Sequence, residues 1–357
     1  MTATLLRRSP GHARARAWRS PAGRFSLRYD ARSGVVCGLL LAAVLVISAV
    51  TLSTGEYDVP LPDMFRALLG DESSGAYFIV HTLRLPRLLT ALLVGVALGV
   101  GGGMFQSLSR NPLGSPDIIG FNTGAATGAL TVILVLHGSM LGTSVGALVG
   151  GIGTALVVYV LAIKKGVQGF RLILIGIGIA AMLASVNSYL LTRAELTDAQ
   201  EALMWLTGSL NGRTWGQAQG ITIAVLVLMP LAIPLGRRLR TLELGDDMAR
   251  GLGIGAETTR LASVVVAVAL TAVSTAVAGP IGFIALSAPQ IARRLTRVPG
   301  PNIMASALTG ALLLAVSDLA AQRMFDSVQL PVGVATGAVG GIYLAWLLSQ
   351  DWRKGHR

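Results

Sequence analysis

The sequence predicts an all-α membrane protein that crosses the bilayer about ten times. Charged residues make up only 13% of the 357 residues, and the mean hydropathy is +0.67, whereas soluble domains carry about 25% charged residues. The apolar residues form runs long enough to cross a bilayer. Lys and Arg fall mainly in every second connection between these runs. These three observations together exclude a soluble domain.

Ten apolar runs, each of which predicts a helix, follow the N-terminal segment. They are 35–52, 88–107, 117–136, 140–163, 172–191, 215–235, 261–278, 281–296, 303–321 and 331–349. About 20 residues at 1.5 Å per residue cross a hydrocarbon layer of roughly 30 Å. The run 281–296 is short for a full crossing, so we expect neighbouring helices to shield it.

The N-terminal 34 residues contain eight arginines and one acidic residue and are interpreted as a disordered cytoplasmic tail that contacts anionic lipid. A cleaved signal peptide is the rival interpretation. The run 35–52 is too long for a signal core and lacks a convincing cleavage site, which favours a retained first helix. The predicted organisation is a basic tail 1–34, a ten-helix domain 35–349 and a short cytoplasmic tail 350–357.

The distribution of Lys and Arg predicts the orientation, because cytoplasmic connections of membrane proteins are enriched in both. With both termini inside, 23 of the 29 basic residues lie in inner segments. The six in outer segments are Arg66, Arg84, Arg87, Arg193, Arg213 and Arg323. A miscounted helix would remove this asymmetry. The asymmetry also accounts for the net charge of +12 without a nucleic-acid partner.

Glycine recurs at four-residue spacing in three of the runs, and small residues let helices approach closely in lipid. The three sets are Gly95, Gly99 and Gly103; Gly142, Gly146 and Gly150; and Gly333, Gly337 and Gly341. We therefore expect a tightly packed bundle. The outer segment 192–214 is expected to form a short helix at the membrane interface.

Several kinds of chemistry are missing from the sequence. No GxxxxGK[ST] phosphate loop, HExxH motif or Cys/His cluster occurs, so we expect no ATPase activity in this chain, no resident metal and no cofactor. Ionisable residues are nearly absent from the predicted spans, where Asp117 and Asp318 lie near helix ends. An ion-coupled transporter usually keeps carboxylates at membrane depth. The sequence therefore favours a transport pathway driven by another subunit, not an enzyme.

Six motifs follow one another along the chain. They are Arg84-Leu-Pro-Arg87, Arg110-Asn-Pro-Leu-Gly-Ser-Pro116, Trp205-Leu-Thr-Gly-Ser-Leu210, the segment 242–253, the segment 279–294, and Leu330-Pro-Val-Gly333. In this order they closely resemble the permease subunits of ABC importers for iron–siderophore complexes and vitamin B12. The resemblance covers about residues 35–349. Within that family, the segments 207–215 and 288–294 are most similar to the ferric-enterobactin type.

This resemblance implies the fold of type II importer permeases and a pathway at the interface of two permease subunits, identical or homologous. It also implies a separate nucleotide-binding ATPase subunit and an extracytoplasmic siderophore-binding protein as partners in the cell membrane. The implied cargo is a ferric siderophore. Cobalamin or haem remains the alternative within the family. A stand-alone secondary transporter and a membrane-embedded enzyme are the alternatives outside it.

The resemblance also assigns roles to individual residues. The residues implied to dock the binding protein are Arg84, Arg87 and Arg323. The residues implied to form part of the cytoplasmic gate are Asn111 and Leu113. The residues implied to couple to the ATPase, within short helices at 241–257, are Leu244, Gly245, Ala249, Leu252 and Gly253. Gln106 is implied to line or support the pathway.

Each assignment has a simpler rival. The arginines could anchor helix ends at lipid headgroups, and Asn111-Pro-Leu113 could be an ordinary turn. The loop 241–257 could be a solvated connector, and Gln106 could join two helices by a hydrogen bond. Two departures from the family also stand out: Gln329 replaces the usual Glu, and no Pro interrupts the last helix, which has Gly340-Gly-Ile-Tyr343 instead.

Overall fold

The computed structural model describes residues 15–19, 26–55, 57–72, 75–116, 120–162, 169–324 and 329–355. Apart from two short strands, the regular structure in these ranges is helical. Helices lie in each of the ten predicted runs. They are α1 (Ala31–Ser53), α3 (Leu85–Ser109), α4 (Phe121–Leu134), α5 (Met140–Ala162), α6 (Gly169–Arg193), α8 (Trp215–Leu242), α10 (Ala256–Ala278), α11 (Ile284–Thr296), α12 (Ile303–Arg323) and α13 (Val332–Gly355).

Seven helical segments are long and apolar enough to cross a membrane, and two shorter apolar helices, Phe121–Leu134 and Val332–Trp346, add to them. One of the seven, Phe78–Ser109, combines the π-helix η1 (Phe78–Arg84) with α3. The helical character of all ten runs is thus confirmed, while the count of ten crossings stays a prediction. The predicted Asp117 lies outside the described residues.

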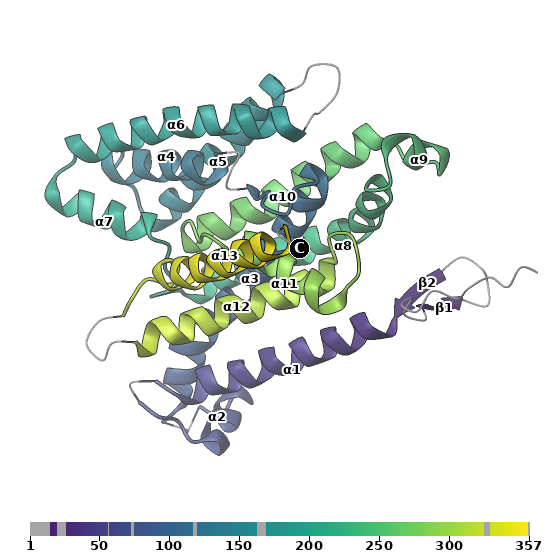
Figure 1. Ribbon diagram of the computed structural model, residues 1–357. Coiled ribbons are helices and arrows are strands. Elements are labelled where there is room, and N and C mark those ends of the chain that lie inside the picture. The colour runs from purple at the N-terminus through teal and green to yellow at the C-terminus, as the bar shows by residue number, and fades with distance from the viewer. Residues whose placement is uncertain are drawn as a thin grey trace, which may run out of the picture.

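Three short helices occupy the connections. They are α2 (Leu61–Leu68), α7 (Leu196–Leu206) and α9 (Asp246–Gly251). Helix α7 lies in the segment where a short helix was expected, and α9 is the one described helix between α8 and α10. Figure 1 shows α2 and α7 at one end of the bundle and α9 at the other. We refer to these as the α2 end and the α9 end.

The strands β1 (Ala15–Arg19) and β2 (Ser26–Asp30) form an antiparallel pair within the segment expected to be disordered. Helix α1 follows directly and begins four residues before the predicted boundary. The Asp30 carboxylate accepts a hydrogen bond from the Arg32 N–H at 3.0 Å, which caps the first turn of the helix. At the other terminus, α13 continues to Gly355, beyond the predicted end of the last helix at residue 349.

Helix α3 is the centre of the bundle and packs on α8, α10, α11 and α12. Its glycines permit these contacts. A methyl group on Gly95 or Gly99 would overlap the backbone of Gly310 or Ser306 in α12, and one on Gly102 would overlap the backbone of Ala285 in α11. The predicted close packing is therefore confirmed for this set. In α13 the result is mixed: a methyl group on Gly333 would overlap the backbone of Thr207, whereas one on Gly337 or Gly341 would meet no atom of the described chain within 4 Å.

We expect Gly99→Leu to destabilise the protein, because the side chain would force α12 away from α3. Overpacking a close contact costs about 1–3 kcal/mol or more. The matched control is Gly38→Leu in α1, since Gly38 is exposed and a Cβ there meets no atom of the described chain within 4 Å. Thermal unfolding in detergent should show a lower Tm for Gly99→Leu and a near-normal one for the control. Equal melting of both variants would contradict this account of the α3–α12 contact.

Candidate functional site

Three apolar side chains are exposed around α9. The exposed fractions of Leu244, Met248 and Leu252 are 68%, 63% and 64%. They follow one another at four-residue spacing in an otherwise polar connection, and no other described segment covers them. We call them the α9 apolar patch. Several large, exposed apolar side chains in one short segment favour a protein interface.

The small residues of this segment serve the fold of the segment itself. Ala249 is fully buried in the main core cluster, so it faces the bundle and cannot form part of an external contact surface. Gly245 and Gly253 have φ values of +112° and +77°, which side-chain-bearing residues rarely adopt. The Gly253 and Ile254 N–H groups bond back to Arg250 and Ala249 at 2.9 Å and end the helix in a Schellman motif.

Asp246 joins α9 to two long helices. Its carboxylate accepts hydrogen bonds from Arg260 of α10 at 2.7 and 2.8 Å and from Arg110, which follows α3, at 3.2 Å. Arg110 also donates to the Leu242 carbonyl oxygen at 2.9 Å. Nearby, the Ser107 hydroxyl donates to Glu243 at 2.7 Å. We call this set the Asp246 clamp; it fastens α9 to the end of α3.

The clamp persists at neutral pH. The hydrogen bond from Arg260, assisted by the charges of Arg260, Arg110 and Arg250, holds the pKa of the Asp246 carboxyl below its ordinary value of 3.8. A lowered folded-state pKa adds stability above the ordinary value, and this stability is lost as pH falls through the folded-state pKa. The clamp therefore weakens only in acid below about pH 4.

The predicted gate residues form a turn directly after Arg110. The Asn111 side-chain oxygen accepts the Leu113 N–H at 2.9 Å, which is a local turn of the Asx type. Gln290 of α11 holds this turn by donating to the Pro112 carbonyl oxygen at 2.6 Å. Leu113 is 40% exposed. The turn is thus anchored by α11 and lies one residue away from the Asp246 clamp.

Gln106 is buried with 2% exposure. Its amide donates to the Leu286 carbonyl oxygen of α11 at 2.9 Å, whereas its own oxygen lacks a partner among the described residues. The side chain therefore joins α3 to α11. It supports the packing of the bundle and does not reach the surface of this chain.

At the α2 end, Arg87 of α3 forms a buried ion pair with Asp318 of α12. The guanidinium donates to both carboxylate oxygens, at 3.0 and 2.8 Å, and the side chains are 14% and 2% exposed. Gln322 donates to the same carboxylate at 2.7 Å, and Gln329 accepts from Arg87 at 3.4 Å. Arg87 is thus committed to a partner inside the chain.

The other two predicted docking arginines differ in their surroundings. Arg84 is partly buried and donates to the carbonyl oxygens of Leu52, at 2.8 Å, and Tyr57. Arg323 is exposed at the end of α12. A further arginine of this end, Arg213, turns inward and donates to Ser209 at 3.0 Å; burial lowers its pKa to about 10. Of these three, Arg323 is the one most available to a partner.

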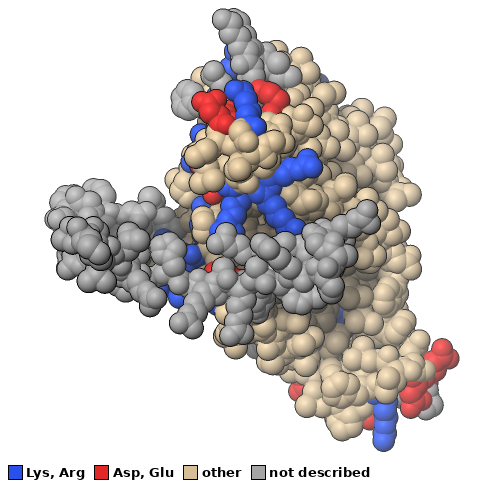
Figure 2. All heavy atoms as spheres, turned by 90° about the vertical axis from the view of Figure 1, so that its right-hand side faces the viewer, with Lys and Arg blue, Asp and Glu red and all other residues tan. Residues whose placement is uncertain are grey.

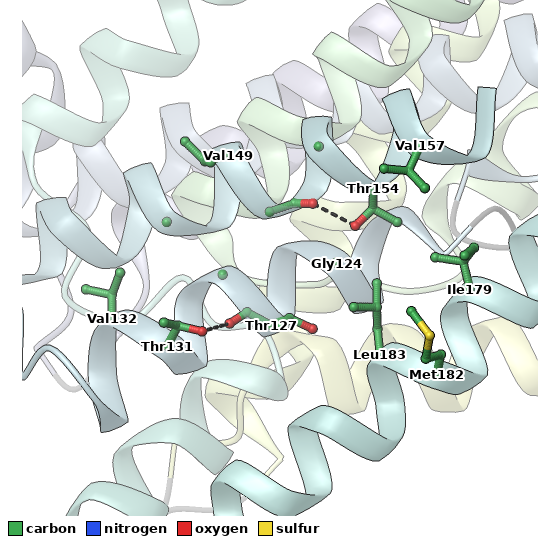
Figure 3. Close-up of a pocket in the computed structure, with 14 residues that line it drawn as sticks. Gly124, Thr127, Thr131, Val132, Val149, Thr154, Val157, Ile179, Met182 and Leu183 are labelled. Atoms are coloured by element: carbon green, nitrogen blue, oxygen red, sulfur yellow. Dashed lines mark hydrogen bonds between the residues drawn. The ribbon is translucent and has the colours of Figure 1, made fainter. Parts of the chain in front are cut away.

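A cavity of about 490 Å³ lies between α4, α5 and α6 (Figure 3). Valine, leucine, methionine and glycine line most of it. The hydroxyls of Thr131 and Thr154 bond to carbonyl oxygens of their own helices, at 2.7 and 2.8 Å. Its lining contains no charged side chain and none of the predicted site residues. The hydroxyls of its three threonines are already bonded to carbonyl oxygens of their own helices, so it offers few free groups to orient a polar ligand.

Several residues of these sites were not predicted from the sequence. Met248 is the middle member of an apolar series, and its spacing from Leu244 and Leu252 could have revealed it. Arg87 was predicted as a docking residue, but its pairing with Asp318 was not, although the two are opposite charges near the same predicted membrane boundary, where ionisable groups tend to pair. The clamp partners gave no such signal, because Ser107, Arg110 and Asp246 lie in different segments and meet only in the folded chain.

Comparison with known proteins gives a consistent result. A model described as the FecCD transport family matches residues 40–350. The ferric enterobactin transport system permease protein FepG of Escherichia coli (strain K12) is 47% identical over 320 residues, which cover 90% of this chain and 97% of that protein. The achromobactin transport system permease protein CbrC of Dickeya dadantii (strain 3937) is 35% identical, covering 94% and 96%.

Solved structures share the fold. A metal-chelate type ABC transporter in an inward-facing conformation superposes with a TM-score of 0.78 at 24% sequence identity, and the match covers 89% of this chain and 99% of that chain. Because the superposition covers most of this chain and nearly the whole of that chain, the helical fold described above belongs to a known architecture.

Breaking the Arg87–Asp318 pair should be costly. We expect Asp318→Ala to destabilise the protein by about 3–5 kcal/mol, because it leaves Arg87 buried without a counter-charge. Asp63→Ala is the matched control, since its pair with Arg66 is exposed at 3.6 Å and worth about 0–1 kcal/mol. The measurement is thermal unfolding in detergent. Recovery of stability in an Arg87→Met/Asp318→Leu variant would show that the unpaired charge causes the loss; equal stability of Asp318→Ala and wild type would refute it.

Proposed function

Because the chain belongs to the FecCD transport family, we propose that it is the permease subunit of an ABC importer that moves a ferric siderophore into the cell. The identity of 47% across 97% of the Escherichia coli ferric enterobactin permease carries this proposal and favours a catecholate siderophore of the enterobactin type. The energy would come from a separate ATPase subunit. The pathway would lie between this chain and a second permease subunit, a copy of it or a homologue.

In this proposal the α9 end and both tails face the cytoplasm, and the chain crosses the membrane ten times. The excess of Lys and Arg in the segments assigned to that side supports this orientation. The start of α1 and the later part of α13 both lie beside the end of α11, as the bond from Arg32 to Leu295 at 2.9 Å and the stacking of Arg294 on Trp346 indicate.

The α9 apolar patch would bind the ATPase, and the Asp246 clamp would transmit its movement. Because the clamp joins α9 to the end of α3, a shift of α9 displaces Arg110 and with it the adjoining turn at Asn111 and Leu113. That turn would act as the cytoplasmic gate. A packed helix bundle responds to such a displacement by switching between discrete arrangements, which alternating access requires.

At the opposite end, Arg323 would be the principal contact for carboxylates of a siderophore-binding protein. Arginine can hold a carboxylate through two parallel hydrogen bonds. Arg84 would add positive charge beside it. Arg87 would contribute indirectly, because its pair with Asp318 fixes the end of α12 that presents Arg323.

The cargo assignment predicts a specific uptake defect. A strain that lacks this chain should fail to accumulate iron from ⁵⁵Fe-labelled ferric enterobactin, and the full chain should restore uptake. Unlabelled ferric enterobactin should compete, whereas cobalamin and haem should not. Normal iron uptake in the deletion strain, or competition by cobalamin, would overturn the assignment.

The two parts of the coupling site should fail differently. Met248→Ser removes apolar contact worth about 1.5–3 kcal/mol when buried, so we expect at least tenfold weaker binding of the ATPase. Asp246→Asn leaves the α9 apolar patch in place, so the ATPase should still bind. The importer with this substitution should, however, move less cargo for each ATP hydrolysed. Binding of the labelled ATPase and the ratio of uptake to hydrolysis in proteoliposomes measure the two effects.

Leu69→Ser is the control for Met248→Ser, because Leu69 is also a large apolar residue and is 88% exposed at the opposite end. This variant should bind the ATPase normally. If Met248→Ser also does so, the α9 apolar patch is not the contact. If Asp246→Asn transports with unchanged efficiency, the clamp does not carry the coupling.

Docking of the binding protein should depend on Arg323. We expect Arg323→Glu to weaken docking by one to two orders of magnitude, since an interfacial charge pair is worth about 1–3 kcal/mol, and raised salt should weaken the wild-type complex. Arg66→Glu, also a charge reversal at an exposed site of the α2 end, is the control. If wild type and Arg323→Glu bind the siderophore-binding protein with the same affinity, Arg323 is only a headgroup anchor.

A further inference from the structure

A small polar pocket opens at the α9 end, between the last turns of α8 and the connection from α11 to α12. It has a volume of about 160 Å³ and is lined mainly by Arg237, Arg240, Pro299, Pro301, Asn302 and Ile303. No role assigned above involves this pocket. Figure 2 looks onto this end of the molecule and shows basic side chains gathered near the middle of the face.

The two arginines have no acidic partner in the described part of the chain. The ion pairs found there involve other residues, and both side chains are exposed. The wall opposite them is rigidly built. The Asn302 amide donates to the Val298 carbonyl oxygen at 2.7 Å and to the Thr296 hydroxyl at 3.1 Å, and its side chain makes no capping hydrogen bond to the first turn of α12. The first N–H groups of α12 add positive potential to that of the arginines.

An apolar stripe leads along α8 to this pocket. Leu226, Ile233, Arg237 and Arg240 lie within roughly 60° of one helix face, at about 100° per residue. Leu226 and Ile233 are 69% and 38% exposed, and the buried residues of α8, such as Leu239, lie on the opposite side. The exposed face is thus apolar along the span and cationic at its α9 end.

We propose that this face binds an anionic phospholipid, with the phosphate of the headgroup between Arg237 and Arg240 and an acyl chain along Ile233 and Leu226. Apolar surface followed by paired cations at a helix end matches the order of acyl chain and phosphate in a lipid. An acidic surface of the ATPase would match the arginines alone. It would leave unexplained why the charges continue an apolar stripe that lies along the membrane span.

The test uses the whole importer, purified through a tag on this chain and equilibrated with equal amounts of phosphatidylglycerol and phosphatidylcholine. Native mass spectrometry then counts the retained lipids. Wild type should retain phosphatidylglycerol in preference. Arg237→Gln should reduce that preference roughly fivefold, and Arg237→Gln/Arg240→Gln roughly 25-fold, at about 1 kcal/mol per basic residue near anionic lipid.

Arg238→Gln is the matched control. Arg238 is exposed and one residue away, but it lies about 100° around the helix, so its loss should leave the preference nearly unchanged. Equal retention by wild type and the double variant, or an equal loss in Arg238→Gln, would overturn the proposal. It would also be overturned if the double variant lost the ATPase but kept phosphatidylglycerol, since the arginines would then belong to the protein contact. None of these outcomes depends on the cargo.

Discussion

The close contact of α3 with α12 is the constraint on which the rest of the structure depends. In lipid no hydrophobic force drives helices together, so packing and polar contacts must do so. Gly95 and Gly99 bring the two backbones together in the middle of the bundle, and Arg87 binds Asp318 near one end. Glycines permit the approach but do not fix the register of one helix against the other. The ion pair does, because its geometry allows only one alignment.

Helix α3 therefore links the two ends of the molecule. One end is fastened by Arg87, and the other reaches the Asp246 clamp through Ser107 and Arg110. Because α3 is enclosed by four helices and interiors are close-packed, it cannot bend freely to absorb a displacement at either end. A permease that receives its driving force from an ATPase and its cargo from the opposite side needs such a stiff connection. The proposed functions of both ends rest on this one element.

The amide at position 329 is consistent with this arrangement. Gln329 accepts a weak hydrogen bond from Arg87, which Asp318 already neutralises. A glutamate there would place a second carboxylate beside one guanidinium and leave the cluster with a net negative charge. The glutamine keeps the bond and avoids that charge. The absence of a proline from the last helix is also visible in the structure. Helix α13 runs without interruption from Val332 to Gly355, as expected of a helix with no internal proline.

The sequence by itself determined the helical class, the positions of the ten helices, the separation of basic from less basic ends, and the absence of an ATP-binding loop. Each of these depends on local composition, because about 20 apolar residues form a helix in lipid whatever their neighbours are. Only the tertiary structure decided what the individual polar side chains do. Arg87 meets Asp318 231 residues away, and Gln106 meets Leu286 180 residues away. Ala249 points into the core, although its spacing alone permitted an exposed contact. Helix packing determines such partners, and the residue pattern along one helix does not indicate which side chain of another helix faces it.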